Sequence, residues 1–261
     1  MGINERNNDL SDPHPREILL DGSDYDYFQV ITDEQTSGYG RNQSLWLNQK
    51  GNLFTSIAFR SEELTPFYQH FVAISLIRIL KNASKQCKNG LEFRIKWPND
   101  IHMVLDGWES KIGGILCESH QLADFENSGL IVVIMGIGLN TRNGFDAEGI
   151  QKLPDDVFGA FGHDNEIFVS EMLGEFDDLR TQELDFVELK KEYDSHLSYL
   201  GDPVILSKSK NFDADSEAIE GVLRGLNRYG GVDIESHSEE KSITQIREMF
   251  TLRRKIDVEG L

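Results

Sequence analysis

The sequence has little cysteine and no long apolar segment, and each shortage excludes a class of protein. Only two cysteines, Cys87 and Cys117, occur in 261 residues. They have neither metal-site spacing nor the density of a secreted disulfide-bonded domain. Every apolar stretch is shorter than the roughly 18 residues of a membrane-spanning helix. With a polar N-terminus that lacks a secretory signal, this predicts a soluble, globular, cytoplasmic protein without a membrane partner.

Positive charge is also scarce. The chain has 26 lysines and arginines against 45 aspartates and glutamates, which gives a formal charge of −19. A field of this sign repels nucleic acid phosphates. No helix-turn-helix precedes the main domain, so we expect no nucleic acid partner and no repressor function. The histidines lack metal-ligand spacing, and we expect no protein-built metal site.

The pattern of apolar residues divides the chain into three parts. Residues 1–16 are polar and charged and predict a disordered tail. Residues 17–200 alternate strand-like and helix-like patterns, which predicts an α+β domain. Its expected strands span 27–31, 52–59, 91–97, 101–105, 112–117 and 130–137, and its expected helices span 65–88, 168–179 and 186–197. Residues 201–261 hold short β-like pieces between Gly, Asn and charge, as in a small barrel.

A glycine-rich loop follows the first predicted strand. It reads Gln35-Thr36-Ser37-Gly38-Tyr39-Gly40-Arg41. Two glycines let the backbone approach a phosphate closely, and Arg41 adds a positive fork. Taken alone, this pattern is more often a plain turn.

The string Lys96-Trp97-Pro98-Asn99-Asp100 ends another predicted strand. Proline fixes its own φ and restricts the residue before it, so the turn holds lysine, amide and carboxylate in a rigid frame. The alternative is an ordinary strand end with an exposed ion pair.

Two more strands carry polar groups beside glycine. Lys111 precedes Gly113 and Gly114, whose missing side chains leave room for a ligand against the backbone. Asn140 closes an apolar strand with an amide that can donate and accept at once. A solvent-exposed hairpin lysine and a turn asparagine are the plain alternatives.

Taken in order, QTSGYGR, Trp46, GNL at 51–53, KWPND, KIGGIL and GIGLN resemble the catalytic domain of biotin protein ligases over roughly residues 28–142. The tail, with IEGVLRGLNRYGGVDI and REMFTLRR, is similar to that family's SH3-like C-terminal domain. The resemblance implies a mixed β-sheet flanked by helices, of the class II synthetase-like type, over residues 17–200. It implies an SH3-like barrel over residues 201–261.

The resemblance also implies a reaction. Such enzymes join biotin to ATP as biotinyl-AMP with Mg²⁺, then transfer biotin to a lysine of the biotin carboxyl carrier domain of a biotin-dependent carboxylase. We expect a monomer or weak homodimer. By matching position, the implied catalytic residues are Arg41, Lys96, Asp100 and Lys111. The implied ligand-binding residues are Gln35, Gly38, Tyr39, Gly40, Arg41, Trp46, Asn99, Lys111, Gly113, Gly114 and Asn140.

Within that set, Lys96 and Arg41 would contact the phosphates of ATP. Asn140 would contact the adenine, and Trp46 would pack over the nucleotide. Converging cations let two anionic substrates meet. We also hypothesise that Asp100 orients the acceptor amine and accepts its proton.

The chain departs from the family in two places. Tyr39 and Gln43 stand where the family's glycine loop has arginine and glycine, which predicts weaker retention of the adenylate. The family's Ser-Thr-Asn segment has no clear counterpart, so one wall of the biotin pocket is expected to be built differently. Two alternatives stay open: a lipoate or octanoate ligase of the same superfold, and a non-catalytic biotin-binding relative.

Overall fold

The structure is a computed structural model, and every structural statement below concerns the residues that it describes. The predicted tail, 1–16, lies outside them. The described residues are 27–41, 44–47, 49–61, 65–85, 91–121, 131–144, 150–182, 185–207, 218–236, 243–246 and 251–254.

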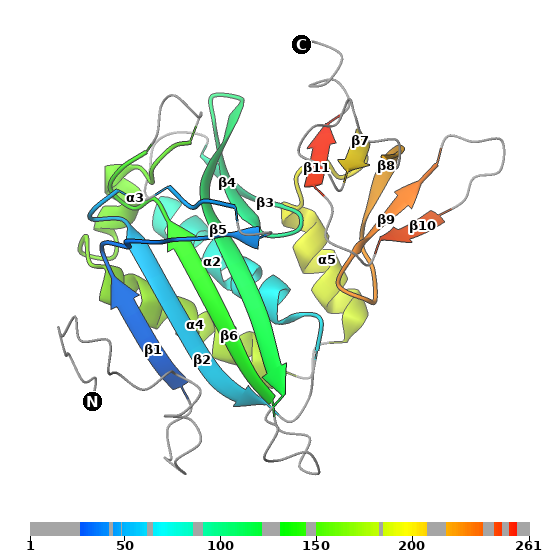
Figure 1. Cartoon of the computed structure of the whole chain (residues 1–261). Helices are drawn as coiled ribbons and strands as arrows, with labels where there is room; N and C mark the ends of the chain where they lie inside the picture. Colours follow the sequence, from blue (N-terminus) through cyan, green and yellow to red (C-terminus); the bar gives the residue numbers. More distant parts are fainter. Residues whose placement is uncertain are drawn as a thin grey trace.

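A six-stranded sheet forms the larger part of the fold (Figure 1). Its spatial order is β1-β2-β6-β5-β4-β3, and every ladder between its strands is antiparallel. The expectation of a mixed sheet was therefore wrong, because β3 to β6 follow one another as neighbouring strands that reverse direction each time. The strands are β1 (Tyr27–Thr32), β2 (Leu53–Ser61), β3 (Glu92–Lys96), β4 (Asp100–Leu105), β5 (Trp108–Gln121) and β6 (Ile131–Leu139).

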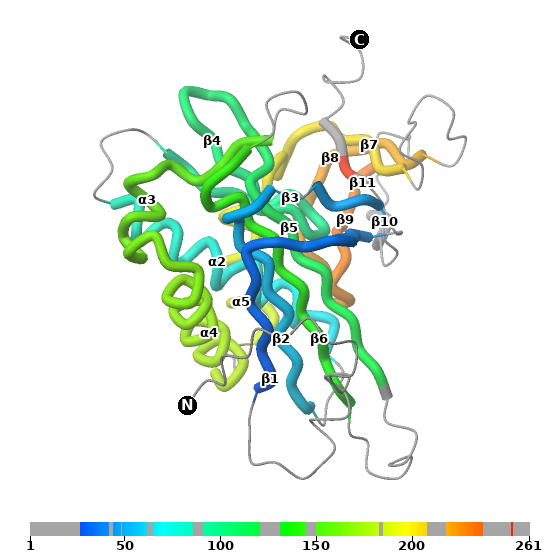
Figure 2. The backbone as a smooth tube through the Cα atoms, turned by 60° about the vertical axis from the view of Figure 1, so that its left-hand side comes forward, coloured from blue at the N-terminus to red at the C-terminus, as the bar shows by residue number. Residues whose placement is uncertain are grey.

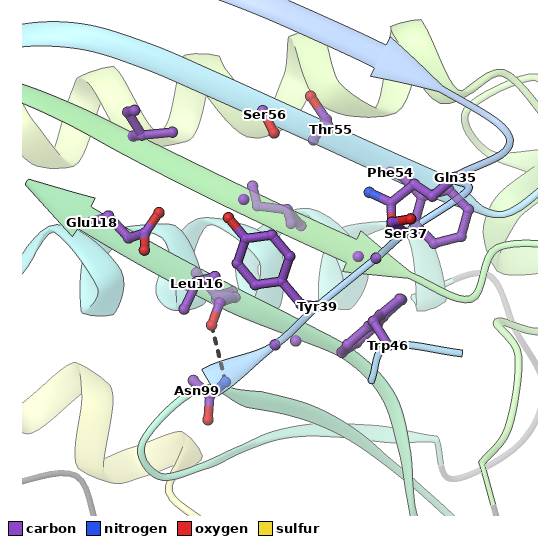
Figure 3. A pocket seen from close by; sticks show the side chains of 18 residues that line it. Gln35, Ser37, Tyr39, Trp46, Phe54, Thr55, Ser56, Asn99, Leu116 and Glu118 are labelled. Carbon is purple, nitrogen blue, oxygen red and sulfur yellow. Dashed lines mark hydrogen bonds between the residues drawn. The ribbon is translucent and has the colours of Figure 1, made fainter. Parts of the chain in front are cut away.

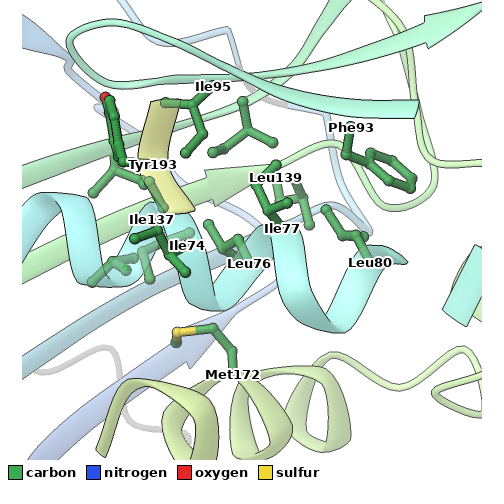
Figure 4. Close-up of a cluster of buried hydrophobic side chains, with 14 of the residues drawn as sticks. Ile74, Leu76, Ile77, Leu80, Phe93, Ile95, Ile137, Leu139, Met172 and Tyr193 are labelled. Atoms are coloured by element: carbon green, nitrogen blue, oxygen red, sulfur yellow. The ribbon is translucent and has the colours of Figure 1, made fainter. Parts of the chain in front are cut away.

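Helices cover one face of this sheet. The main ones are α2 (Tyr68–Ser84), α4 (Asn165–Thr181) and α5 (Phe186–His196), with a short α3 (Asp155–Gly159) that the sequence pattern did not predict. Thr65 Oγ1 accepts a hydrogen bond from the backbone N–H of Phe67, just before α2 begins. Figure 4 shows Ile74 and Ile77 of α2 packed between the sheet and Met172 of α4. No helix in the described part of the chain is long and apolar enough to cross a membrane.

The face of the sheet opposite the helices carries a separate set of side chains, because neighbouring residues of a strand point to opposite faces. On β5, Ile115 lies toward the helices in the core, whereas Gly114, Leu116 and Glu118 alternate with it toward the other side. The segment after β1 crosses this second face, and both views of the backbone show it passing in front of β6 and β5 (Figures 1 and 2).

The C-terminal part forms a second antiparallel sheet, of order β10-β9-β8-β7-β11. The side chains of Lys190 and Asp194 on α5 bond to the backbone of Leu226 at distances of 2.9 Å and 2.8 Å. The described ladders do not close into a ring, so the SH3-like barrel and the boundary near Leu200 stay predictions. The strands are β7 (Pro203–Ser207), β8 (Ile219–Leu226), β9 (Val232–Glu235), β10 (Ile243–Ile246) and β11 (Thr251–Arg254).

Candidate active site

The glycine loop folds back on itself over the open face of the sheet. The N–H of Gly40 donates to the carbonyl of Ser44 at 2.7 Å, and the N–H of Trp46 donates to the carbonyl of Gly38 at 3.0 Å. Tyr39 and Leu45 form an antiparallel bridge between these two bonds. The loop is thus a small hairpin that brings Trp46 down onto the sheet (Figure 3).

Trp46 lies flat on two glycines. Gly114 of β5 and Gly138 of β6 are direct ladder partners, so the positions of their missing side chains are adjacent on one face. A Cβ on Gly138 would stand 2.6 Å from Cζ2 of Trp46, and one on Gly114 would stand 3.0 Å from Cζ3. A side chain on Gly138 would force the indole to move, and one on Gly114 would crowd it, so glycine at these positions suits the packing of Trp46.

The turn between β3 and β4 joins the loop to the sheet. The Asn99 amide donates through Nδ2 to the carbonyl of Ile115 at 3.0 Å. Its Oδ1 accepts from Nη1 of Arg41, also at 3.0 Å. Burial lowers the pKa of the Arg41 guanidinium, and the negative charge of Asp100 offsets this only in part. An arginine still carries its charge at neutral pH, so the turn holds a positive charge beside the loop.

A β-bulge directs Lys111 to the same side. Ile101 pairs with Gly113, but His102 pairs with Lys111, which leaves Ile112 as an extra residue in β5. Ile112 is fully buried in the core. Its insertion lets Lys111 and Gly114 share a face although they are three residues apart. The Lys111 ammonium accordingly lies 2.8 Å from Oδ1 of Asp100 and 5.0 Å from the centre of the Trp46 ring.

A cavity of about 190 Å³ lies under the loop. It is lined by backbone and side chains from the loop, β2, β5, β6 and the turn after β3. Of the residues predicted to bind ligand, those in its wall are Gln35, Gly38, Tyr39, Gly40, Trp46, Asn99 and Gly114. Arg41 contacts Asn99 of this wall, and Lys111 lies over the ring of Trp46. The structure thus brings together most of the residues that the sequence singled out.

Six predicted residues are outside the cavity wall: Arg41, Asp100 and Lys111, which lie beside it, and Lys96, Gly113 and Asn140. Lys96 is the ladder partner of Asp100, but its ammonium stands over the ring of Tyr199, 5.8 Å from the centre. A side chain on Gly113 would point at Leu139, not into the cavity. Asn140 is buried, and its predicted contact with adenine is untested.

Asn140 belongs to a buried amide network centred on Asn52. Asn52 donates through Nδ2 to Oδ1 of Asn140 at 3.2 Å, and its own Oδ1 accepts from the backbone N–H groups of Arg142 and Asn143. Asn140 donates in turn to the carbonyl of Gln151 at 3.2 Å. GNL at 51–53 supported the family resemblance, yet sequence reasoning gave Asn52 no role.

Two other polar residues in the cavity wall, Ser56 and Glu118, were also missed. A signal for Glu118 was present in the sequence. It follows Gly114 by four residues in a strand, so period-two alternation places both on one face.

The described residues contain no group of three or more His, Cys, Asp or Glu side chains that could hold a metal ion. Mg²⁺ commonly binds through substrate phosphates and only one or two protein carboxylates.

The fold and the site define a class: an α+β domain with a cavity on the open face of an antiparallel sheet, beneath a glycine loop and beside two cationic side chains. Comparison with known proteins then gives the family. Residues 19–140 match the model of the biotin/lipoate A/B protein ligase family. This segment is similar to the domain of that family, and the resemblance to biotin protein ligases is confirmed.

Individual relatives agree with the family match. The chain is 30% identical over 155 residues to the chloroplastic biotin–protein ligase 1 of Arabidopsis thaliana, over 53% of this chain and 39% of the relative. It is 30% identical over 120 residues to a human biotin–protein ligase, over 44% of this chain and 15% of the relative. The matches therefore span less than half of these relatives' lengths.

A solved structure extends the likeness. The biotin protein ligase of Aquifex aeolicus, in complex with biotin and ATP, superposes with a TM-score of 0.60 at 25% identity. The superposition covers 87% of this chain and 89% of that one.

Proposed function

We propose that this chain is a biotin protein ligase that forms biotinyl-5′-AMP from biotin and ATP and transfers biotin to a lysine of an acceptor protein. One observation carries the proposal: Arg41 and Lys111 meet at the Asn99–Asp100 turn, beside a cavity on the open face of the sheet. The family match over residues 19–140 and the biotin and ATP bound by the Aquifex relative support it.

In the first step, a carboxylate oxygen of biotin attacks the α-phosphorus of ATP, and pyrophosphate leaves as the bond to the β-phosphate breaks. Both reactants are anions, so cations must lower their repulsion where they meet. Lys111 and Arg41 are held in place before substrate arrives, by Asp100 and Asn99 respectively. Positioned charge of this kind needs little reorganisation during the reaction. Trp46 would give the nucleotide an aromatic surface.

In the second step, an acceptor lysine attacks the acyl carbon, an amide forms, and AMP leaves. The amine must lose protons, since a free lysine with a pKa of about 10.4 is charged at neutral pH. One oxygen of Asp100 holds Lys111. We expect its second oxygen to orient the incoming amine and take its proton.

Four further parts of this proposal rest on the resemblance. They are Mg²⁺ carried in with ATP, a biotin carboxyl carrier domain as acceptor, a small SH3-like barrel at the C-terminus, and a cytoplasmic location. The Arabidopsis relative is described as chloroplastic, so the location needs direct imaging in cells.

The deciding experiment combines the chain with ATP, Mg²⁺, biotin and a purified biotin carboxyl carrier domain, followed by intact mass measurement of the acceptor. We expect one biotinyl addition that depends on ATP. Parallel reactions with lipoate and octanoate on their own acceptor domain test the neighbouring activity. A biotin-binding protein without catalysis would release no pyrophosphate, and that result would refute the proposal.

A further inference from the structure

The candidate cavity has ends of opposite charge. Arg41 and Lys111 stand at the end formed by Gly114, Trp46 and the Asn99 turn. Four residues farther along β5, the carboxylate of Glu118 lines the other end. Strand geometry sets the distance between Gly114 and Glu118 at about 13 Å. This spacing suits a small acid that lies along the strand.

The Glu118 end is otherwise only weakly polar. Within the described residues, no hydrogen bond or ion pair engages the Glu118 carboxylate. Its ladder partner is Ile134, and the nearby wall includes Leu116 and the hydroxyl of Ser56. Figure 3 shows Glu118 and Trp46 on opposite sides of the cavity, with the ring of Tyr39 between them. An ionised carboxylate can only accept hydrogen bonds, so this end suits a ligand group that donates them.

We propose that Glu118 is a specificity-determining residue, which selects an acid whose far end carries N–H donors. The inference rests on the proposed function and deepens it. The substrate carboxylate would be repelled by Glu118 and attracted by Lys111 and Arg41, which fixes its direction in the cavity. The cyclic urea of biotin, at the end away from its carboxylate, then presents two N–H groups toward Glu118, and bonds from N–H donors to a carboxylate are among the stronger ones.

The same residue disfavours acids with an apolar end. The dithiolane of lipoate and the alkyl end of octanoate have no N–H group. Either acid would displace water from the Glu118 carboxylate without donating a hydrogen bond in its place. A polar group that loses its hydrogen-bond partners in this way lowers the affinity for the acid. The Glu118 end therefore discriminates between biotin and the substrates of the neighbouring ligase activity.

The test compares acids in biotin-dependent or octanoate-dependent ATP–pyrophosphate exchange by the full chain. The variants are Glu118→Leu and Glu118→Gln. Glu92→Leu is the matched control, because Glu92 is an exposed strand carboxylate outside the cavity. Thermal melts check that each variant is folded. Glu118 is exposed, so we expect a fall of about tenfold in kcat/KM for biotin in Glu118→Leu, mostly through KM. The octanoate value should stay equal or rise.

Glu118→Gln keeps one acceptor oxygen, so its kcat/KM for biotin should lie between those of wild type and Glu118→Leu. The kcat/KM of Glu92→Leu for biotin should match that of wild type. If wild type uses biotin but Glu118→Leu keeps its kcat/KM for biotin within twofold of wild type, the role of Glu118 is wrong and the ligase proposal stands. If wild type uses octanoate or neither acid, the proposed function itself is wrong, and the role of Glu118 falls with it.

Discussion

The contact between Trp46 and Gly138 predicts a sharp difference between two glycines on one strand. A Cβ on Gly138 would lie 2.6 Å, 2.7 Å and 3.0 Å from atoms of the Trp46 indole. A Cβ on Gly136, two residues earlier on the same face, would lie no closer than 3.6 Å to any neighbour. Gly138→Ala must therefore move the indole, whereas Gly136→Ala needs no movement.

Overpacking of this kind costs about 1–3 kcal/mol, and we expect Gly138→Ala to lower the free energy of unfolding by that amount. Gly136→Ala should stay within about 0.5 kcal/mol of wild type, since replacing a strand glycine reduces the entropy of the unfolded chain. Urea unfolding measures both. In a Trp46→Ala background the cost of Gly138→Ala should vanish, which gives a coupling free energy of about 1–3 kcal/mol.

Fluorescence supplies a second readout. The chain has three tryptophans, and Trp108 is 80% exposed while Trp97 is buried. In a Trp108→Phe background, Gly138→Ala should shift the emission to longer wavelength as Trp46 leaves its partly enclosed place, and Gly136→Ala should not. Equal unfolding free energies and equal spectra for the two alanine variants would show that Trp46 does not rest on Gly138.

Three more predictions test other parts of the structure. Asp100→Asn should slow transfer from preformed biotinyl-AMP to the acceptor by at least about tenfold, and only a modest slowing would argue against Asp100 as proton acceptor. Asn52→Ala leaves the Oδ1 of Asn140 and two backbone N–H groups without their partner, so urea unfolding should show a loss of about 2–5 kcal/mol. Asn143 is only half-buried and its side chain bonds the carbonyl of Lys50, so Asn143→Ala should cost under about 1 kcal/mol. Similar losses of unfolding free energy in Asn52→Ala and Asn143→Ala would contradict the network. Burial lowers the pKa of His70 to about 4, so the unfolded chain binds the proton first and stability should fall by about 2–3 kcal/mol between pH 6.5 and 4.5. His70→Phe should lack this part of the fall, and an unchanged pH dependence would show that His70 does not titrate as a buried group.

Much of the site could be predicted from the sequence because its parts are local. The glycine loop and the turn after β3 are short segments whose residue types restrict the backbone. Most strands and helices followed from their apolar period, with ends shifted by a few residues. β5 runs from Trp108 to Gln121 and is longer than the apolar stretch 112–117 that predicted it.

The remaining features depend on contacts between distant segments. The Asn140 amide is bound by Asn52, 88 residues earlier in the chain, and no local pattern reveals that partner. The antiparallel order of the sheet depends on where each strand joins its neighbours. Strict alternation places Lys111 on the face opposite Gly114, and only the pairing of His102 shows otherwise.

The single surplus residue in β5 decides the direction of the side chain before it. In a regular ladder that kept every residue of β5, Ile112 would pair with His102, and Lys111 would turn into the layer beneath the helices, away from the anions it is proposed to neutralise. The bulge therefore lets one more apolar side chain enter the core without moving the lysine before it off the open face.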